Sequence, residues 1–186
     1  MKSKSYHLSK GFTLIELLTV IAIIGLLSAI VVTSLTSARL KARDARRLND
    51  VMQVKMALDL YFDTFHTYPA LTGSNPACNG WYTSKDDVFM QPLITNKFLG
   101  AALKDPTQDG SSSCGNYAYY KFEAGEYGCP ANKGDFYVLG VRTMETVTGS
   151  NIAPTSPGFK CPSRDFQIDA TLGKQFDWVM GKFENE

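Results

Sequence analysis

The chain has 186 residues, a formal net charge of +1 and 44% hydrophobic residues, which suits one globular domain with appendages. The charge is unevenly distributed: the first eleven residues carry three lysines and no acid, which leaves −2 for the rest. Residues 39–47 add +4 and Glu16 adds −1, which leaves −5 from Leu48 onward. This acidic region excludes nucleic-acid binding that rests on overall charge.

A long apolar run dominates the N-terminal part. From Phe12 to Ala38 the residues are almost all apolar or small, and Glu16 is the only one with a formal charge. A bilayer core about 30 Å thick needs about 20 such residues in a helix, so the run is long enough to span a membrane with some tilt. A carboxylate costs roughly 2.5–3.5 kcal/mol at the centre of such a span and less near the entry, where Glu16 lies. The acid therefore needs a structural or functional reason.

The residues around this acid form a motif. The run is longer than the roughly 7–15 apolar residues of an ordinary secretory signal, and the lysines before it lead to a Gly11-Phe12 junction. The sequence Gly11-Phe12-Thr13-Leu14-Ile15-Glu16-Leu17-Leu18 resembles the prepilin signature of type IV pilins and of the pseudopilins of type II secretion. The resemblance is specific over residues 8–30 and becomes one of general architecture beyond them.

The resemblance implies a role for each residue of the motif. Gly11 would be the last residue of a leader, residues 1–11, that a prepilin peptidase removes on the cytoplasmic face, and Phe12 would become a methylated N-terminus. Glu16 would pair with the N-terminal amine of a neighbouring subunit during assembly, since an acid in apolar surroundings is tolerated when a cation meets it. Thr33 stands where many major pilins have proline, so the choice between a major and a minor subunit stays open.

Simpler interpretations of the same residues remain. Glu16 is also an acid near a helix N-terminus, where the helix dipole favours negative charge by about 0.3–1 kcal/mol. The apolar run also fits a plain N-terminal anchor, or an export signal cut after Ala38, because Thr36-Ser37-Ala38 is a run of small residues.

Cations flank the apolar run on both sides, so charge alone leaves its orientation open. The prepilin leader favours an N-terminus inside the cell, in a protein that crosses the cytoplasmic membrane once. The basic cluster that follows the run then lies at the outer membrane surface. Three interpretations apply to it: contact with lipid headgroups, a solvated helix face, or binding of nucleic acid. Its cations are Arg39, Lys41, Arg43, Arg46 and Arg47.

The helix is expected to continue past the apolar run, because no proline precedes Pro69. Apolar residues recur there at helical spacing and predict one broad packed face. They are Leu48, Val51, Leu58, Phe62 and Phe65, with an adjoining row of Met52, Met56 and Leu60. Tyr68-Pro69 predicts the end, since the residue before proline avoids helical backbone. The result is one helix from Phe12 to about Thr67, with residues 12–38 as its transmembrane or filament-core half and residues 39–68 as its amphipathic half.

Residues 69–186 are predicted to form a globular α+β region. Ser84 is a candidate N-cap for a short helical stretch over residues 86–90. Tyr117–Phe122 and Phe136–Arg142 are predicted strands because they are rich in aromatic and β-branched residues. The last stretch reads as a short helix or a strand. The resemblance implies a pilin-like α+β fold, in which a small antiparallel sheet packs on the long helix.

Four cysteines follow the apolar run: Cys78, Cys114, Cys129 and Cys161. An even number in a loop-rich region outside the cytoplasm predicts two disulfides, and the sequence leaves three pairings open. Zinc is the alternative, but successive cysteines are 36, 15 and 32 residues apart, without the close pairs of a zinc site.

Asp105 and Asp109 fall at the first and fifth positions of a calcium-loop pattern. The twelfth position is Asn116, where a glutamate is expected, so an ordinary polar turn is the alternative. No phosphate-binding loop, nucleophile motif or paired metal motif is present, so no catalytic residue and no other cofactor is predicted. A membrane-anchored enzyme therefore has no supporting pattern.

These observations predict a structural subunit of a type IV pilus-like filament, with the helices of residues 12–38 bundled inside. Its expected partners are prepilin peptidase, an inner-membrane assembly platform, membrane lipid before assembly and other copies of the chain, with no nucleic acid. The filament would be extracellular or periplasmic. The alternatives are a pseudopilin of a type II secretion system, and a minor pilin whose head serves adhesion or DNA uptake.

Overall fold

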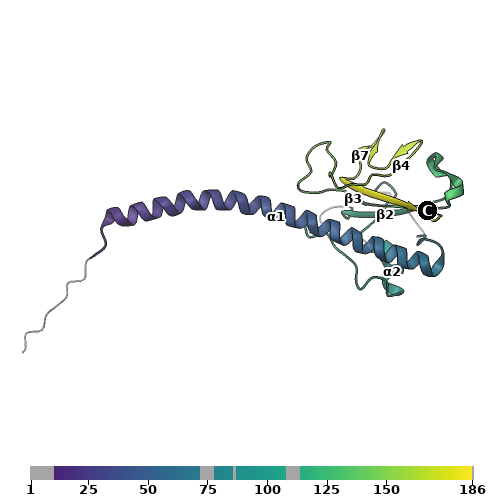
Figure 1. Cartoon of the computed structure of the whole chain (residues 1–186), viewed down its shortest axis with the longest axis horizontal. Coiled ribbons are helices and arrows are strands. Elements are labelled where there is room, and N and C mark those ends of the chain that lie inside the picture. Colours follow the sequence, from purple (N-terminus) through teal and green to yellow (C-terminus); the bar gives the residue numbers. More distant parts are fainter. Residues whose placement is uncertain (1–10, 72–77, 86, 108–113, 186) are drawn as a thin grey trace, which may run out of the picture. The chain divides into compact units, whose positions relative to one another are not determined.

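The computed structural model describes residues 11–71, 78–85, 87–107 and 114–185. The chain forms two compact units, Met1–Arg39 and Leu40–Glu186, and we call the second the head unit. Helix α1 (Leu14–Phe65) contributes residues to both (Figure 1).

Helix α1 has 52 residues, and its first part is long and apolar enough to cross a membrane. The predicted helix from Phe12 to about Thr67 is confirmed apart from two residues at each end. At the start, Oγ1 of Thr13 accepts a hydrogen bond from the backbone N–H of Glu16, so Thr13 caps the helix, which begins at Leu14. At the other end, His66 leaves the helical conformation with a φ of +55°.

Within the described residues, four strands form an antiparallel sheet, in the order β1 (Tyr82–Thr83), β2 (Tyr117–Phe122), β3 (Phe136–Val141) and β8 (Trp178–Phe183). β2 and β3 pair over their full length, from Tyr117 opposite Val141 to Phe122 opposite Phe136. The first predicted strand is confirmed, and the second ends one residue before Arg142. The C-terminal stretch, read as a helix or a strand, contains β8.

Short elements connect these strands. They are η2 (Val88–Met90), α2 (Gln91–Thr95), η3 (Glu126–Gly128), η4 (Ala131–Lys133) and two hairpins, β4 (Lys160–Cys161) with β5 (Arg164–Asp165) and β6 (Ile168–Asp169) with β7 (Gly173–Lys174). The helical stretch predicted over residues 86–90 is present as η2, but its predicted cap is wrong. Asp87 holds the N-cap position, and the Oγ of Ser84 accepts a hydrogen bond from the backbone N–H of Tyr117. Ser84 thus continues the pairing of β1 with β2.

The sheet of the head unit is covered on both faces. The second part of α1 lies on one face, and the hairpins that contain β4 and β7 lie on the other (Figure 1). On the α1 side, fully buried helix residues pack with fully buried sheet residues: Val51, Val54 and Leu58 with Tyr119, Tyr137 and Leu139. The opposite side holds a second cluster rich in aromatic rings, which includes Trp81, Phe122, Phe136, Phe166 and Phe176.

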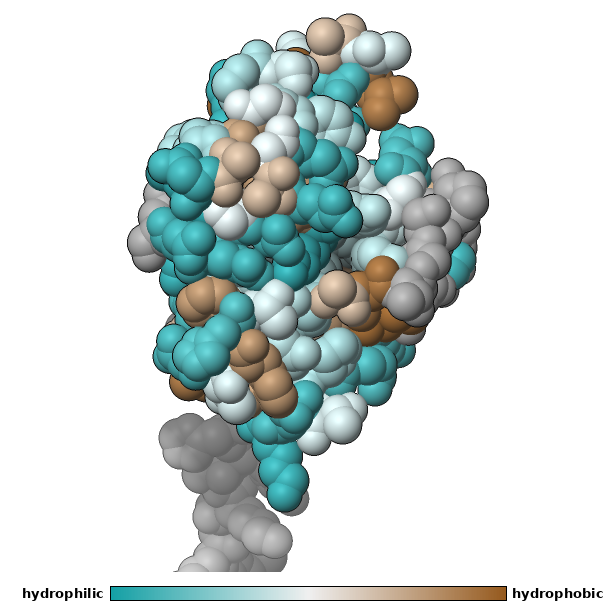
Figure 2. Space-filling model, turned by 90° about the vertical axis from the view of Figure 1, so that its right-hand side faces the viewer, coloured by the Kyte–Doolittle hydropathy of each residue, from teal (hydrophilic) through white to brown (hydrophobic). Residues whose placement is uncertain are grey.

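The apolar face predicted for the second half of α1 is only partly packed. Val51 and Leu58 are fully buried, but Met52, Met56 and Leu60 are 45%, 57% and 50% exposed. The row at intervals of four therefore faces away from the sheet, and the prediction that it adds to the packed face is wrong. The face of the molecule in Figure 2 is mostly hydrophilic, with apolar residues in small separate patches.

Candidate assembly segment and the ion-pair cluster of the head

The first turn of α1 is closed by a reciprocal pair of side chains. The backbone N–H and the Oγ1–H of Thr13 both donate to Oε2 of Glu16, at 2.8 and 2.6 Å. The backbone N–H of Glu16 in turn donates to Oγ1 of Thr13 at 3.3 Å. This is a capping box, in which two side chains satisfy helix-start groups that would otherwise lack partners. The Thr-x-x-Glu spacing in the sequence is the signal from which this cap could have been predicted.

The apolar residues before, within and after this cap are exposed in the single chain. Phe12 is 81% exposed and Leu14 is 77% exposed, and their neighbours along the first part of α1 are similar. The stretch includes Ile15, Leu17, Leu18, Ile21, Ile24, Leu27, Ile30, Val31 and Leu35. An exposed apolar surface of this extent is typical of a segment that enters a membrane or packs on other chains.

Two glycines in this segment have no steric reason within the chain. A Cβ atom added at Gly11 or at Gly25 would meet nothing within 4 Å. Glycine in a helix interior costs about 1 kcal/mol relative to alanine, so Gly25 weakens α1, and no close contact within the chain requires a glycine there.

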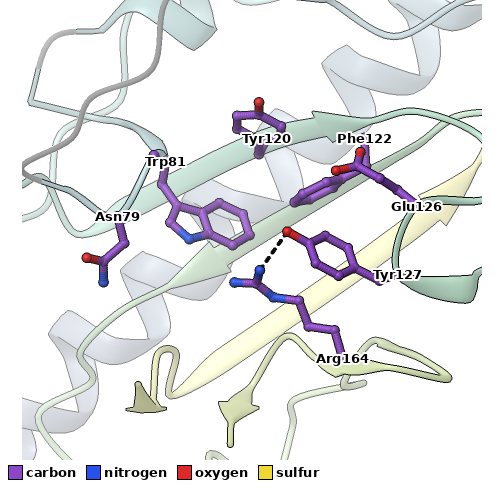
Figure 3. Close-up of a pocket in the computed structure, with 8 residues that line it drawn as sticks. Asn79, Trp81, Tyr120, Phe122, Glu126, Tyr127 and Arg164 are labelled. Atoms are coloured by element: carbon purple, nitrogen blue, oxygen red, sulfur yellow. Dashed lines mark hydrogen bonds between the residues drawn. The ribbon is translucent and has the colours of Figure 1, made fainter. Parts of the chain in front are cut away.

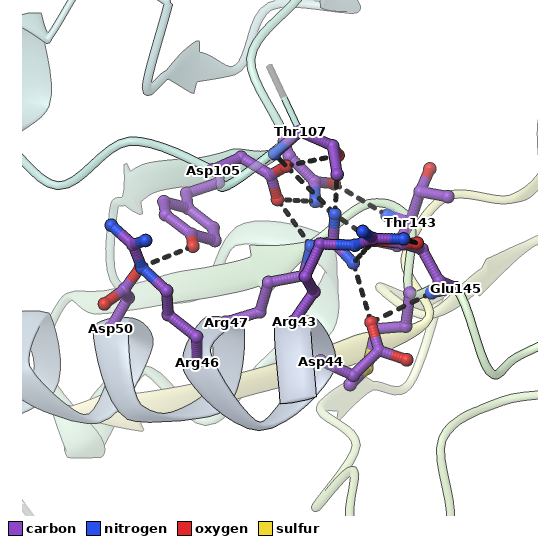
Figure 4. Close-up of polar contacts among 12 residues, drawn as sticks. Arg43, Asp44, Arg46, Arg47, Asp50, Asp105, Thr107, Thr143 and Glu145 are labelled. Carbon is purple, nitrogen blue, oxygen red and sulfur yellow. Dashed lines mark hydrogen bonds and ion pairs between the residues drawn. The ribbon is translucent and has the colours of Figure 1, made fainter. Parts of the chain in front are cut away.

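In the head unit, α1 contributes a buried arginine to an ion-pair cluster (Figure 4). The Nε and Nη2 atoms of Arg47 donate to the two carboxylate oxygens of Asp105, at 2.5 and 3.0 Å. Its Nη1 donates to Asp44 at 2.7 Å and to Glu145 at 2.9 Å. Arg43 forms a second ion pair with Glu145, with a distance of 2.7 Å from its Nε to Oε1. The cluster therefore joins α1 to the loop before β2 and to the segment after β3.

The charges of this cluster stabilise one another against burial. Burial opposes the charge of Arg47, but the bonds to Asp105 and Asp44 outweigh it and raise the pKa of the guanidinium. Burial likewise opposes ionisation of Asp105, but its bonds from Arg47, Asn116 and Thr107 hold the pKa of that carboxyl well below its usual range. The hydrogen bond from Arg43 lowers the pKa of Glu145. All three groups are thus charged at neutral pH.

This cluster changes the interpretation of the basic segment after the apolar run. Arg47 is buried, so a solvated helix face is wrong for this residue. Arg39 and Lys41 are exposed, and Arg46 is exposed with its Nε 4.0 Å from Asp50. Part of the positive charge counted in the sequence is therefore matched inside the head and is not offered to lipid or nucleic acid.

Asp105, the first residue of the calcium-loop pattern, belongs to this cluster. Both carboxylate oxygens of Asp105 accept hydrogen bonds, from Arg47, Thr107 and Asn116. Asp109 lies outside the described residues. The described parts of the chain hold no group of three or more His, Cys, Asp or Glu side chains placed to bind a metal. Calcium binding remains a prediction, and Asp105 is already engaged by a cation of the chain itself.

The four cysteines form two disulfides, Cys78–Cys114 and Cys129–Cys161. The predicted disulfides are confirmed, and the pairing that the sequence left open is the one between successive cysteines. The first bridge joins the segment before β1 to the segment before β2. The second joins the end of η3 to β4. With all four sulfurs in disulfides, no thiolate is left for zinc.

Comparison with known proteins bears on the N-terminal segment. A family model described as the prokaryotic N-terminal methylation motif matches residues 7–32. This segment is similar to the N-terminal segments of pilins and pseudopilins. Pilins and pseudopilins are structural subunits, and the long apolar helix with a small antiparallel sheet is a pilin-like layout.

Curated relatives of this pilin-like chain carry the name type II secretion system core protein G. The protein from Escherichia coli (strain K12) is 40% identical over 60 residues, which cover 32% of this chain and 41% of that protein. The protein from Pectobacterium carotovorum subsp. carotovorum is 34% identical over 67 residues, which cover 36% of this chain and 43% of that protein. The chain thus spans less than half of the length of the curated relatives it matches. No solved structure matches it significantly.

Proposed function

We propose that the chain is a pseudopilin of a type II secretion system, cut after Gly11 and polymerised through α1. The observation that carries this proposal is the exposed apolar part of α1, with a single acid at its entry directly behind the Gly11-Phe12 junction. The names of the relatives favour a pseudopilin over the type IV pilus subunit that the sequence analysis favoured.

Processing after Gly11 explains a glycine that the fold does not require. A side chain at this position would meet nothing in the chain, so packing places no limit on its size. A peptidase that binds the residue before the scissile bond would impose such a limit. We therefore assign Gly11 to recognition by a prepilin peptidase on the cytoplasmic face. The precursor crosses the cytoplasmic membrane once, with its N-terminus inside.

We expect assembly to use Oε1 of Glu16, the carboxylate oxygen that takes no part in the cap. Both bonds from Thr13 end on Oε2, and Oε1 has no hydrogen-bond partner among the residues that the structure describes. Cleavage creates a charged amine on Phe12, and the amine of a neighbouring subunit reaching Oε1 would form an ion pair in apolar surroundings. Such a pair favours one register between adjacent helices, because a carboxylate left alone there is costly.

Gly25 serves the same assembly. Small residues let two helix backbones approach closely when no water is present to drive packing. The empty space around Gly25 in the single chain leaves room for the neighbouring helix. Copies related by a rotation that does not close then form an open filament. The apolar parts of α1 lie inside it, the head units lie outside, and an inner-membrane platform drives its assembly in the periplasm.

The test is deletion of the gene in the native host, followed by complementation with the intact gene. We measure secreted enzymes in the medium and surface filaments by electron microscopy. The proposal predicts that secretion is lost and restored while surface pili are unaffected. Loss of surface pili with normal secretion would show that the chain is a type IV pilus subunit instead.

A further inference from the structure

The head unit contains a hollow of about 280 Å³ beside the sheet, on the face away from α1 (Figure 3). Its walls come from four places in the head unit. Trp81 precedes β1, Tyr120 and Phe122 belong to β2, and Tyr127 and Arg164 lie in η3 and β5. In Figure 3 the side chains of Trp81, Tyr127 and Arg164 point toward one another across this space.

Both disulfides hold the walls of the hollow in place. Cys78 lies three residues before Trp81, and its bridge to Cys114 ties that segment to the rest of the head. Cys129 lies two residues after Tyr127, and its partner Cys161 lies three residues before Arg164. The backbone N–H of Ser163 also donates to the carbonyl of Tyr127 at 3.0 Å. A hollow whose walls are fixed before binding loses little entropy when a ligand enters, so it is preorganised.

The apolar part of the lining is a set of aromatic rings. Trp81 packs edge-on against Tyr120 and Phe122, with ring centroids 6.2 and 6.0 Å apart. Phe122 in turn packs edge-on against Tyr127 at 5.7 Å. Trp81 and Phe122 are only 3% and 6% exposed, so the half-buried rings of Tyr120 and Tyr127 supply most of the ring surface that a ligand can reach. A phenol group presents an apolar ring with a polar edge, which suits a ligand that has apolar and polar faces of its own.

Polar groups that can still form hydrogen bonds surround these rings. The indole N–H of Trp81 forms no hydrogen bond among the residues that the structure describes. The side chains of Asn79 and Glu126 are exposed at the rim, and Glu126 uses only Oε2, as the acceptor for the backbone N–H of Glu123. The hollow therefore offers donors and acceptors together.

The charges of the lining point to a neutral ligand. The Nε of Arg164 lies 3.7 Å from Asp169, and its guanidinium lies over the ring of Tyr127 at 4.7 Å. The Nη1 of Arg164 also donates to the hydroxyl of Tyr127 at 2.8 Å. Among the described residues, the lining holds one cation, Arg164, and one anion, Glu126, so neither an anion nor a quaternary ammonium would find a net charge of opposite sign there.

We propose that this hollow binds a ring of a neutral saccharide. The apolar C–H face of a sugar ring packs on aromatic side chains, and its hydroxyls donate and accept hydrogen bonds at once. The volume of the hollow lies just below the range of about 300–1,000 Å³ that holds drug-sized ligands, so it takes a single ring. A second hollow of about 530 Å³ shares Tyr120, Phe122 and Glu126 with it, which gives an extended glycan room to continue.

The test titrates the full-length chain in detergent with glucose, N-acetylglucosamine, choline and inorganic phosphate, and follows tryptophan fluorescence. Trp178 is fully buried, with its Nε1–H bonded to the carbonyl of Thr155, so Trp81 reports on the hollow. We expect saturable binding of at least one of the two sugars at concentrations up to ~10 mM, ten times the Kd of a millimolar site. Choline and phosphate are expected to give no saturable change.

Three variants locate the binding. Glu126→Gln removes the charged acceptor, and Asn79→Gly removes the amide while keeping the left-handed backbone of Asn79, whose φ is +55°. Each is expected to weaken sugar binding about tenfold, as for a lost hydrogen bond to a bound group. The control Asp63→Asn changes an exposed acid of α1 and is expected to leave binding unchanged. No saturable change with either sugar, binding of choline or phosphate instead, or equal affinity in all variants would overturn the proposal.

Discussion

Arg47 is a buried cation held by three carboxylates from three parts of the head unit. Asp44 comes from α1 itself, Asp105 from the loop before β2 and Glu145 from the segment after β3. Removing water from so many charges is costly, and the pairing repays that cost only while every partner is present. The cluster therefore fixes where α1 meets the loops around the sheet.

Replacing Arg47 should lower the free energy of unfolding of the head more than replacing its exposed neighbour Arg46. Arg47→Met leaves two buried aspartates without their cation, so we expect a loss of about 3–5 kcal/mol in the free energy of unfolding. Arg46→Met changes a side chain that is 62% exposed, and we expect a change within about 0.5 kcal/mol. Urea unfolding of the full-length chain in detergent measures both. Equal losses in the two variants would show that the cluster does not stabilise the head.

The same cluster predicts how stability depends on pH. The pKa values of Asp44, Asp105 and Glu145 are lowered in the folded head. As the pH falls, these carboxyls take up protons in the unfolded chain near their ordinary pKa of about 4, while in the folded head they stay ionised to lower pH. The free energy of unfolding should therefore be steady near neutral pH and fall below about pH 4.

Asp105→Asn tests this prediction, because it removes the carboxyl with the largest lowering. Unfolding measured from pH 7 to pH 3 should show a shallower decline in this variant than in the native chain. Asp63→Asn, which alters an exposed acid, should retain the native slope. An unchanged slope in Asp105→Asn would contradict the assignment of the acid sensitivity to this cluster.

At the scale of elements, the first turn of α1 combines a helix cap with a proposed assembly contact. Glutamine serves in a capping box as well as glutamate does, so Glu16→Gln retains the bond from Thr13 and removes the charge. We expect this variant to be cut and inserted normally while the amount of assembled filament falls roughly tenfold or more, since charge-assisted bonds are the stronger ones. Cross-linking of subunits in the native host, with immunoblots of the cut form, measures both.

Thr13→Ser is the matched control for the cap. Serine keeps the hydroxyl that bonds to Glu16, so cutting and assembly should both remain near native levels. Normal assembly of Glu16→Gln would show that Glu16 acts only as a cap, which is the simpler interpretation of this acid.

The elements that depend on local signals could be predicted from the sequence. The end of α1 follows from Tyr68-Pro69, and β2 follows from a dense run of aromatic residues. β8 could not be assigned, because Phe176, Val179 and Phe183 fit a helical spacing as well as a strand. The structure resolves this by long-range packing: the ring of Phe159 lies 2.5 Å from the place where a Cβ of Gly181 would stand, which only glycine permits.

At the scale of the whole molecule, the chain divides its surface between two tasks. The apolar part of α1 is exposed, as expected of a segment that enters a membrane or packs on other copies. The head unit buries its own hydrophobic core on both faces of the sheet. The sequence predicted this division from composition and from the motif around Gly11. It could not predict the burial of Arg47, because Asp105 and Glu145 lie 58 and 98 residues away along the chain.

The proposed function requires that the chain is cut after Gly11 and assembles through the helix that then begins at its N-terminus. The most direct test is the mass of the N-terminal peptide of the mature protein, purified from the native host. Cleavage after Gly11 and methylation predict a peptide that starts at Phe12 and is heavier by one methyl group. A peptide that starts at Met1, or at Arg39, would contradict it, because the first indicates a permanent anchor and the second an exported soluble protein.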